Sequence, residues 1–556
     1  MLLGLFLLTL MAQPGPAEAQ VAQIERDALI ALYQATNGDD WVTNSGWLGE
    51  IGTECTWYGV VCVGDSVTRI ALDSNGLTGS LPAELADLTG LVYLSLYNGE
   101  VTGPLPAGLS SLVDLEVLAI DRQQLSGTIP AELGELSKLR VLDLSVNALE
   151  GEIPGELGSL ALLEELRLND NQLSGPIPGE LGDLAGLLVL SLYNNNLDGT
   201  IPGTLSGLEE LQSLRLYGNQ LSGTLPEFLG DLADLERLEL QSNNFTGEIP
   251  EGLGNLAQLQ SLILSSNDLT GSIPASLGNL QNLQSLYLGN NALSGAIPAE
   301  FGNLTSLGLL VLSNNGLTGS LPAELGKMSS LFRLYLNNNQ FSGALSEALF
   351  APGNFASLLG LYAQANNFSG PIPAGLGNLP KLTEVNLSQN QFSGAVPQSI
   401  LDNADLDAYL LNGSGNDELM FAGWPAPYNG VTPAPGLGLE FNNIGVFNPQ
   451  DGYIYSCLRL ELNGEPGAID GVTEFGIAFG VLSEAEGLIG VVMQRQFNKG
   501  KARNEFSQYP DCSGVFELET GLYTDYIDVN GDIFLASFLL VDDVQLTLQL
   551  QSLEAI

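Results

Sequence analysis

The sequence contains no histidine and few basic residues. It has 16 lysines and arginines against 64 aspartates and glutamates among 556 residues, which gives a net charge of −48. The absence of histidine removes the commonest general base and metal ligand. The negative field makes nucleic acid and anionic membrane surfaces poor partners. We therefore expect no nucleic-acid binding, and the acidity by itself indicates solubility, for which a saline habitat is one explanation.

Long apolar segments are also scarce. Residues 1–19 contain one apolar run, LLGLFLLTLMA, which is too short to span a bilayer. The tripeptide AEA at 17–19 offers a small-x-small cleavage site, although only the amino terminus supplies the positive charge usual before such a run. We predict a signal peptide over 1–19, no membrane insertion, and a secreted, extracellular protein.

Cysteine occurs only four times. Cys55 and Cys62 lie in CTWYGVVC, whereas Cys457 and Cys512 flank much of the C-terminal region. An even number in an exported chain suggests two disulfides, and the local pairing of Cys55 with Cys62 and of Cys457 with Cys512 is the most economical. Four buried free thiols are the alternative.

Motifs that carry catalysis are absent as well. The sequence has no glycine-rich phosphate loop and no nucleophile elbow. The segment DVNGD at 528–532 has the first three ligand offsets of a calcium loop but lacks the glycine and glutamate that complete one, and Asn530-Gly531 between apolar runs favours a hairpin. We expect no metal, no cofactor and no enzymatic activity, although abundant carboxylates leave a two-carboxylate glycosidase open by residue type.

The sequence is rich in a 24-residue repeat. An asparagine recurs every 24 residues from Asn75 to Asn339, with Gly99 and Gln123 as the two replacements, and Asn366 and Asn390 follow after 27 and 24 residues. These fourteen repeats, here called coils, have the fixed period that is typical of a solenoid. Asparagine has both a donor and an acceptor, so this column can satisfy backbone groups from coil to coil.

The other columns of the repeat have physical roles. In the coil of Asn171, Leu166 and Leu168 alternate as in a strand, and the leucines and isoleucine around them fill the coil. Glycine follows the asparagine column by four residues in all fourteen coils, which a turn with positive φ explains. Proline follows by seven in thirteen of them and stops a long helix from forming.

The pattern LxxLxLxxNxLxGxIPxxLGxL resembles the plant-type leucine-rich repeat over about residues 70–411. The preceding ALIALYQATNGDDWVTNSGWLGE and CTWYGVVC resemble the helical N-terminal cap of that family with its C-x6-C disulfide. The family includes ectodomains of receptor-like kinases and receptor-like proteins, and polygalacturonase inhibitors. The resemblance implies an α/β leucine-rich-repeat solenoid, mostly β with short 3-10 or helical segments and a curved parallel sheet, that serves as a secreted recognition scaffold.

The domain organisation follows from these segments. We predict a signal peptide at 1–19, a cap at 20–69, leucine-rich repeats at 70–411, a linker at 412–436 and a β-rich domain at 437–556. The linker is rich in proline and glycine, as in WPAPYNGVTPAPG. The last region has lost the 24-residue period, and its short runs of valine, isoleucine, phenylalanine and tyrosine predict an all-β, sandwich-like domain.

The candidate binding residues lie in the variable positions of each strand. The residues six, four, two and one before the asparagine column are expected on the concave face, and six of the 16 cations and seven tyrosines fall there. Tyrosine and arginine are favoured at binding hot spots. The densest group, which lies beside Glu165, predicts a ligand-binding site formed by Arg167, Tyr193, Arg215, Tyr217, Arg237 and Glu239. Alternatively, these side chains only decorate an exposed sheet, with arginine paired to neighbouring glutamate.

Two functional hypotheses result. In the first, the chain is a secreted, non-enzymatic recognition scaffold that binds an extracellular protein or carbohydrate on the concave face. In the second, it is a structural or adhesive component of a surface or matrix, with the solenoid as spacer and the C-terminal domain as attachment module. The sequence indicates no particular oligomeric state.

Overall fold

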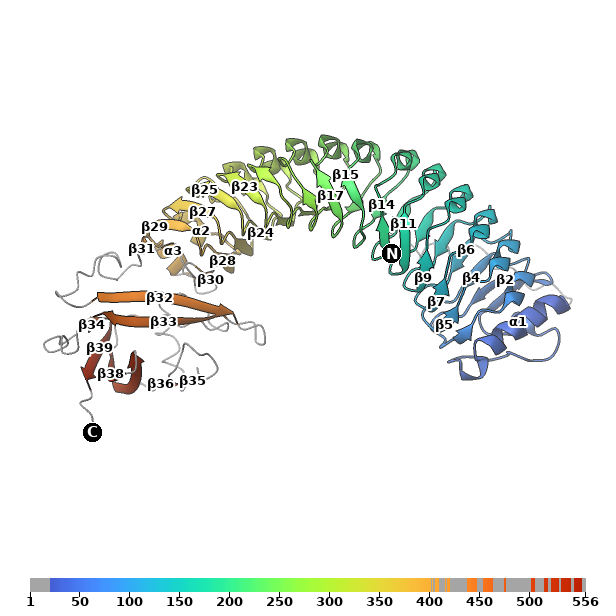
Figure 1. Ribbon diagram of the computed structural model, residues 1–556, viewed down its shortest axis with the longest axis horizontal. Helices are drawn as coiled ribbons and strands as arrows, with labels where there is room; N and C mark the ends of the chain where they lie inside the picture. The colour runs from blue at the N-terminus through green and yellow to red at the C-terminus, as the bar shows by residue number, and fades with distance from the viewer. Residues whose placement is uncertain are drawn as a thin grey trace. The chain divides into compact units, whose positions relative to one another are not determined.

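A computed structural model describes residues 21–401, the short segments 403, 406–409, 416 and 418–420, and the backbone of eight strands between 438 and 552. The chain divides into two compact units, Met1–Leu259 and Gln260–Ile556, which we describe separately (Figure 1). The predicted signal peptide at 1–19 lies outside the described residues. In the described part of the chain, no helix is long and apolar enough to cross a membrane.

The first unit begins with the predicted cap. Helix α1 (Gln23–Ala35) is followed by two short 3-10 turns, η1 (Gly38–Asp40) and η2 (Glu54–Thr56), and by the antiparallel strands β1 (Val60–Val63) and β2 (Ser66–Ala71). Cys55 and Cys62 form the expected disulfide, with 5.4 Å between their Cα atoms. The local pairing predicted for these two cysteines is therefore confirmed.

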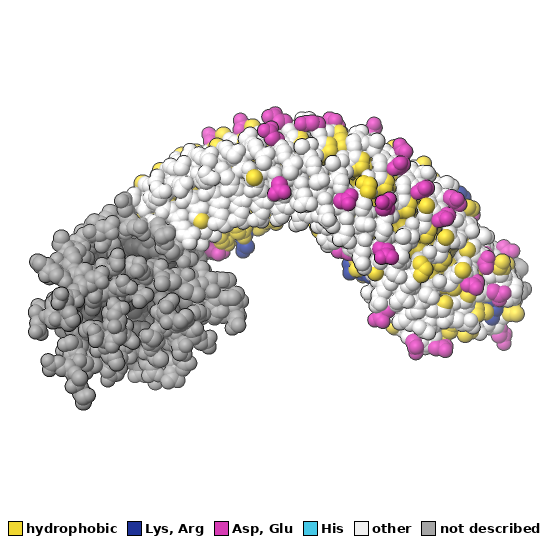
Figure 2. All heavy atoms as spheres, in the orientation of Figure 1, with side chains coloured by type: hydrophobic (Ala, Val, Ile, Leu, Met, Phe, Trp, Pro, Cys, Tyr) yellow, Lys and Arg dark blue, Asp and Glu magenta, His cyan; other side chains and the backbone are white. Residues whose placement is uncertain are grey.

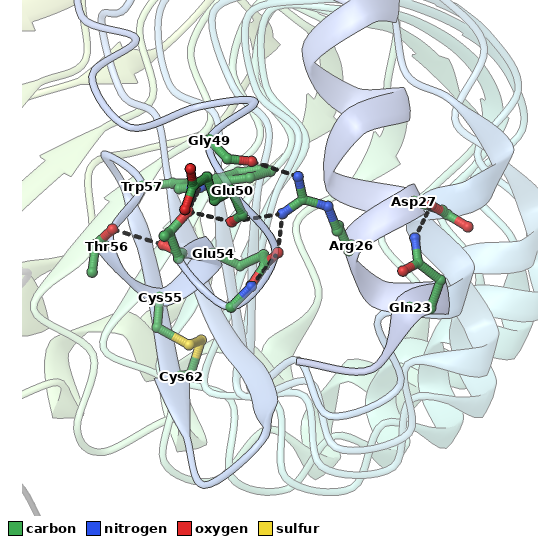
Figure 3. Close-up of polar contacts among 12 residues, drawn as sticks. Gln23, Arg26, Asp27, Gly49, Glu50, Glu54, Cys55, Thr56, Trp57 and Cys62 are labelled. Atoms are coloured by element: carbon green, nitrogen blue, oxygen red, sulfur yellow. Dashed lines mark hydrogen bonds and ion pairs between the residues drawn. A yellow bond between two sulfur atoms is a disulfide. The ribbon is translucent and has the colours of Figure 1, made fainter. Parts of the chain in front are cut away.

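An ion pair fastens α1 to the loop beside the disulfide. The guanidinium of Arg26 pairs with the nearly inaccessible carboxylate of Glu54 and also donates to the carbonyl oxygen of Gly49 at 2.6 Å (Figure 3). The same guanidinium lies over the ring of Trp57, 5.2 Å from its centroid. Because a buried charge is stable only when it is paired and hydrogen-bonded, these contacts hold the cap in one geometry.

The main sheet of the first unit is parallel from β2 onward, with one strand per coil. Its strands follow one another in chain order and in register, Leu166 opposite Leu142 and Leu190, for example. The strands after β2 are β4 (Tyr93–Ser95), β6 (Val117–Ala119), β8 (Val141–Asp143), β10 (Glu165–Arg167), β12 (Val189–Ser191), β14 (Ser213–Arg215) and β16 (Arg237–Glu239).

A second row of short parallel strands follows the asparagine column, and each coil is closed by a 3-10 turn after its proline. The strands are β3 (Thr78–Ser80), β5 (Glu100–Gly103), β7 (Gln124–Gly127), β9 (Ala148–Gly151), β11 (Gln172–Pro176), β13 (Asn196–Asp198), β15 (Ser222–Thr224) and β17 (Asn244–Gly247). The turns, on the outer side of the curve of this unit (Figure 1), are η3 (Ala83–Asp87), η4 (Ala107–Ser111), η5 (Ala131–Glu135), η6 (Gly155–Ser159), η7 (Gly179–Asp183), η8 (Gly203–Gly207), η9 (Glu227–Asp231) and η10 (Glu251–Asn255).

The second unit repeats this architecture. Its main strands are β18 (Ser261–Ile263), β20 (Ser285–Tyr287), β22 (Leu309–Val311), β24 (Arg333–Tyr335), β26 (Gly360–Tyr362), β28 (Glu384–Asn386) and β30 (Asp407–Tyr409). Its second row contains β19 (Asp268–Leu269), β21 (Ser294–Gly295), β23 (Gly316–Gly319), β25 (Gln340–Gly343), β27 (Asn367–Gly370), β29 (Gln391–Ala395) and β31 (Glu418–Met420). The coils close with η11 (Ala275–Asn279), η12 (Ala299–Asn303), η13 (Ala323–Lys327) and the single helical turns α2 (Ala374–Gly377) and α3 (Gln398–Leu401).

The leucine columns form the core of both units. In the coil of Asn171, Leu166 and Leu168 are fully buried, as are the leucines that surround them, and Ile177 is 2% exposed. Full burial of one such side chain contributes about 1.5–3 kcal/mol relative to exposure. The predicted solenoid with a parallel sheet and short 3-10 turns is confirmed, and the glycine of every coil has the positive φ that was expected, +77° at Gly175.

The asparagine column forms a ladder of side-chain hydrogen bonds. Asn171 donates to the carbonyl oxygens of Leu168 in its own coil and Leu144 in the preceding one, and it accepts from the N–H of Leu149 at 3.0 Å. Asn416 continues the ladder: it donates to Leu387 and accepts from Phe392, both at 2.8 Å. The parallel pairing of β31 with β29 likewise runs beyond residue 411, into the range that the sequence predicts as a linker.

Eight strands follow in the C-terminal region, and those that pair are antiparallel. They are β32 (Gly438–Phe447), β33 (Ile454–Asn463), β34 (Phe475–Gly476), β35 (Ala502–Glu505), β36 (Val515–Leu518), β37 (Leu522–Val529), β38 (Asp532–Val541) and β39 (Gln545–Ser552). Val529 pairs with Asp532, so β37 and β38 form the antiparallel pair expected on either side of Asn530-Gly531, two residues that lie outside the described ones. The sandwich-like packing stays a prediction, as does the pairing of Cys457 with Cys512, because Cys512 lies outside the described residues.

Candidate functional site

The exposed face of the main sheet carries the variable side chains. Each strand of the main sheet from β4 to β26 has a buried leucine in its centre, so the two residues that flank it point to the opposite face, as Glu165 and Arg167 do around Leu166. Register places the flanking residues of neighbouring strands side by side: Ser191 lies opposite both Arg167 and Arg215, and Arg215 lies opposite Glu239. Side chains from consecutive coils therefore form one continuous surface.

Tyr193 and Tyr217 form the centre of the predicted site. They occupy the same position of neighbouring coils, and their rings stack in parallel with centroids 4.3 Å apart and an interplanar angle of 9°. Each ring uses one face on the other ring, so a ligand can meet only the second face of each ring, the ring edges and the hydroxyl groups. The sequence predicted the location of the two tyrosines but not this packing.

Burial raises the pKa of both hydroxyls above its usual value, and nearby negative charge adds to the effect. Asp170 contributes at Tyr193, and Glu239 contributes at Tyr217. Both groups are therefore neutral phenols at physiological pH and can donate as well as accept a hydrogen bond.

Two of the three predicted arginines are paired with glutamate. Arg167 forms an ion pair with Glu165 on its own strand, and Arg215 lies 3.5 Å from Glu239 on the next strand, measured from Nε to Oε2. Arg237 lies opposite Ser213 and is exposed, and it forms no ion pair within the described residues. The structure thus brings Tyr193, Tyr217, Arg215 and Glu239 together, whereas Arg167 and Arg237 lie on the flanking strands β10 and β16.

Two buried polar atoms of this face lack a hydrogen-bond partner among the described residues. They are Nε of Arg215, whose 3.5 Å contact with the carboxylate of Glu239 is an ion pair but not a hydrogen bond, and Oε1 of Gln241. Unpaired buried polar atoms are rare and costly, and a ligand that shifts the side chains of Arg215 and Gln241 and bonds to these atoms removes that cost. Sequence analysis missed Gln241, and no signal in its coil distinguishes it from other polar residues at this position.

Two arginines nearer the cap engage tyrosine instead of glutamate. Arg69 lies over the ring of Tyr93 at 3.6 Å from the centroid, and Arg122 lies 5.9 Å from that of Tyr97. Within the described residues, no group of histidine, cysteine, aspartate and glutamate side chains could hold a metal ion. The chemistry that the described face offers is therefore recognition by ring edges, hydroxyls, guanidinium groups and carboxylates.

Comparison with known proteins agrees with this architecture. A family model described as a leucine-rich repeat region matches residues 153–286 and 226–403, and a second leucine-rich repeat model matches 138–160. The leucine-rich repeat ectodomain of the Arabidopsis receptor kinase HAESA, in complex with an N-terminal extended IDA peptide hormone, is 34% identical. That match covers 72% of this chain and 73% of the HAESA ectodomain chain, with a TM-score of 0.54.

Two further structures extend the comparison. The PEPR1–AtPEP1 structure is 33% identical, with a TM-score of 0.66, and the match covers 71% of this chain but only 55% of that one. A leucine-rich repeat protein of Leptospira interrogans is 31% identical, with a TM-score of 0.51, and the match covers 64% of this chain and 85% of that one. The repeat, the cap and these matches together show that the chain belongs to the leucine-rich repeat family.

Proposed function

We propose that this chain is a non-enzymatic, extracellular recognition protein that binds a peptide segment of a protein partner on the exposed face of the first unit. The observation that carries the proposal is the stacked pair of Tyr193 and Tyr217 beside Arg215 and Gln241. Nε of Arg215, which has only its ion pair with Glu239, and Oε1 of Gln241 are buried without a hydrogen-bond partner. A peptide backbone supplies the donors and acceptors that satisfy such atoms, and tyrosine and arginine are the residues that most often dominate binding energy. Structures of relatives in complex with peptide hormones support a ligand of this kind.

The packing of the tyrosines favours a peptide over a sugar. Carbohydrate rings bind against aromatic faces, whereas Tyr193 and Tyr217 each use a face on the other. One face of each ring remains, together with the ring edges and the hydroxyl groups, and the edges and hydroxyls suit amide groups and aliphatic side chains. A glycan ligand is therefore an outcome that the test must distinguish.

The competing function is that of a structural or adhesive component, in which the solenoid is a spacer and the C-terminal domain attaches it. The ion pairs of Arg167 with Glu165 and of Arg215 with Glu239 favour it, because paired arginines on an exposed sheet need no ligand. This function predicts that removal of residues 424–556 abolishes attachment and that changes on the sheet have no effect.

The test is an array of secreted proteins, their overlapping peptides and glycans, probed with the full chain. The variant carries Arg167→Ala, Arg215→Ala and Tyr217→Ala. A control variant carries Tyr58→Ala, Lys138→Ala and Arg140→Ala, which likewise removes one tyrosine and two cations but outside the proposed site. We expect the site variant to lose at least 30-fold in affinity for a protein or peptide hit, about 2 kcal/mol as for a hot spot, and the control to bind normally. Equal binding by both variants, or hits on glycans alone, would refute the proposal.

A further inference from the structure

The second unit contains a second stacked pair of tyrosines. The rings of Tyr335 and Tyr362 lie 4.4 Å apart with an interplanar angle of 3°. Tyr362 leans over Gly360, where an added Cβ would meet its ring at 2.9 Å, and its hydroxyl donates to the carboxylate of Glu384. The absence of a side chain at Gly360 thus permits this arrangement of rings.

Beside this pair lies the only exposed apolar surface of large side chains in the described part of the second unit. Phe332 is 41% exposed and Leu359 is 39% exposed. They occupy the same position of neighbouring coils, and the N–H of Leu359 donates to the carbonyl oxygen of Phe332 at 2.9 Å. The ring of Phe332 packs onto Gly308, where an added Cβ would lie 2.6 Å from its Cε1 atom. The absence of a side chain at Gly308 therefore leaves room for the ring in this position.

Arg333 separates the apolar side chains from the tyrosines. Its guanidinium donates to the hydroxyl oxygen of Tyr335 at 3.2 Å and forms no ion pair within the described residues. The carboxylate of Glu384, two strands away on β28, accepts a hydrogen bond from the hydroxyl of Tyr362. In a chain with four acidic residues for each basic one, an exposed arginine without a carboxylate partner is available for an external one.

From these observations we propose that the second unit carries its own recognition surface, formed by Phe332, Arg333, Tyr335, Leu359 and Tyr362. Its ligand is a peptide segment of a partner protein in which a large apolar side chain lies next to a carboxylate. The apolar side chain packs on Phe332 and Leu359, and the carboxylate pairs with Arg333. The surface is separate from the site proposed in the first unit, and it does not depend on that site.

Charge limits the kind of partner further. The net charge of −48 repels a partner that is acidic throughout. The carboxylate that Arg333 binds therefore belongs to a protein that is otherwise neutral or basic. Local attraction to Arg333 and long-range attraction to the whole chain then act together.

The test begins with a phage-displayed library of random 12-residue peptides, selected on the immobilised full chain. Peptides that are enriched are synthesised with a fluorescent label, and their affinity is measured by anisotropy. We expect enriched peptides with aspartate or glutamate within two residues of a leucine, isoleucine or aromatic residue. Arg333→Gln and Phe332→Ser should each weaken these peptides at least tenfold, whereas Arg167→Ala, Arg215→Ala and Tyr217→Ala together should leave them unchanged.

A cycle of paired changes isolates the predicted ion pair. Replacing the acidic residue of the peptide by its amide should cost about tenfold against the natural chain and nothing against Arg333→Gln, since the two changes remove one interaction. Both protein positions are exposed, and thermal unfolding of the variants checks that they fold. Peptides that bind equally well to Arg333→Gln, or that also lose affinity through the changes in the first unit, overturn the proposal. Failure of the site in the first unit leaves these outcomes unaltered, so the two proposals are tested independently.

Discussion

Asp121 lies half-buried on the exposed face of the main sheet, two residues before Gln123. Burial and then repulsion from Asp143 raise the pKa of its carboxyl group from 3.8 to about 6, while Arg122 opposes the change and Asp73 adds to it. The repeat places an acidic residue at this position, but only the folded structure shows that three carboxylates from different coils interact. The pKa shift of Asp121 therefore depends on how neighbouring coils stack.

The raised pKa predicts that Asp121 lowers the stability of the folded chain at neutral pH. Between about pH 4 and pH 6 the folded chain holds a proton at Asp121 that the unfolded chain has released, so stability falls as the pH rises through this window and stays lower above it. Asp121→Asn should therefore stabilise the protein at pH 7.5, by about 1 kcal/mol after allowance for solvent screening at a half-exposed group, and hardly at pH 4. Urea unfolding followed by circular dichroism measures the difference. Asp65→Asn, in the exposed β1–β2 turn, is the control; an equal gain at both pH values would contradict the explanation.

The tyrosine pairs show a second limit at the residue scale. Periodicity places Tyr193, Tyr217, Tyr335 and Tyr362 on the exposed face, and the expected interpretation is that their ring faces are available to a ligand. Parallel strands bring identical positions of neighbouring coils close enough for the rings to stack instead. Stacking leaves one face of each ring, with its edge and hydroxyl group, for a ligand, and this smaller aromatic face favours a peptide over a sugar.

At the scale of the elements, the third coil differs from the others because Gln123 replaces the asparagine of the hydrogen-bond ladder. Gln123 accepts from the N–H of Val101 at 2.9 Å and donates to the carbonyl oxygen of Leu96. Among the described residues it makes no hydrogen bond to its own coil of the kind that Asn147 makes with Leu144 at 3.1 Å. The preceding rung is Gly99, which has no side chain to offer. A Cβ at Gly99 would lie 2.8 Å from Oε1 of Gln123, so the longer glutamine occupies the space that an asparagine in the previous coil would need.

This packing predicts a coupled pair of substitutions. Gly99→Asn alone should gain little or destabilise the protein, because the new side chain meets Gln123. Gly99→Asn together with Gln123→Asn should restore two rungs and stabilise the first unit by about 1–2 kcal/mol, from new hydrogen bonds and the loss of a flexible glycine. Unfolding of the natural chain, both single variants and the double variant forms the cycle. Strictly additive effects would show that the two positions do not compete for space.

The cap contains some features that the family resemblance predicts and others that it does not. The C-x6-C spacing and the helical segment were sufficient to predict a helix and a disulfide, and both are present. The ion pair of Arg26 with Glu54 and its contact with Trp57 could not be derived in the same way, because the two charges are 28 residues apart and neither belongs to a repeating column.

For the molecule as a whole, net charge is the dominant electrostatic feature. Exposed acidic side chains recur on the 3-10 turns, where Glu132, Glu156 and Glu180 are spaced by one coil (Figure 2). Because successive turns pack closely, with Gly158 against the backbone of Glu180, these charges stack at short spacing. Folding therefore concentrates like charges that the extended chain keeps apart.

Salt should stabilise the folded chain as a result. Raising NaCl from 10 mM to 500 mM shortens the Debye length from about 30 Å to less than 10 Å and screens the repulsion. We expect the midpoint of thermal unfolding at pH 7.5 to rise by several degrees over this range. At pH 3.5, where many carboxylates are protonated, the rise should be clearly smaller. A solenoid need not unfold in one step, so the comparison uses midpoints and not extrapolated free energies. Identical salt dependence at the two pH values would rule out carboxylate repulsion as its cause.

The sequence by itself determined the solenoid, because each coil repeats the same pattern of leucine, asparagine, glycine and proline. Alternating leucines set the strand, the asparagine sets the turn, and glycine and proline close the coil, so that neighbouring coils can only stack. The tertiary structure alone decided which variable side chains act together. Contacts such as those of Tyr193 with Tyr217, of Tyr362 with Glu384 and of Asp121 with Asp143 join residues of different coils, and their geometry depends on side-chain rotamers and on glycines such as Gly360 that leave room for a ring. The repeated residues of each coil determine the scaffold. The candidate sites consist of residues at variable positions, and their contacts form only when the coils stack.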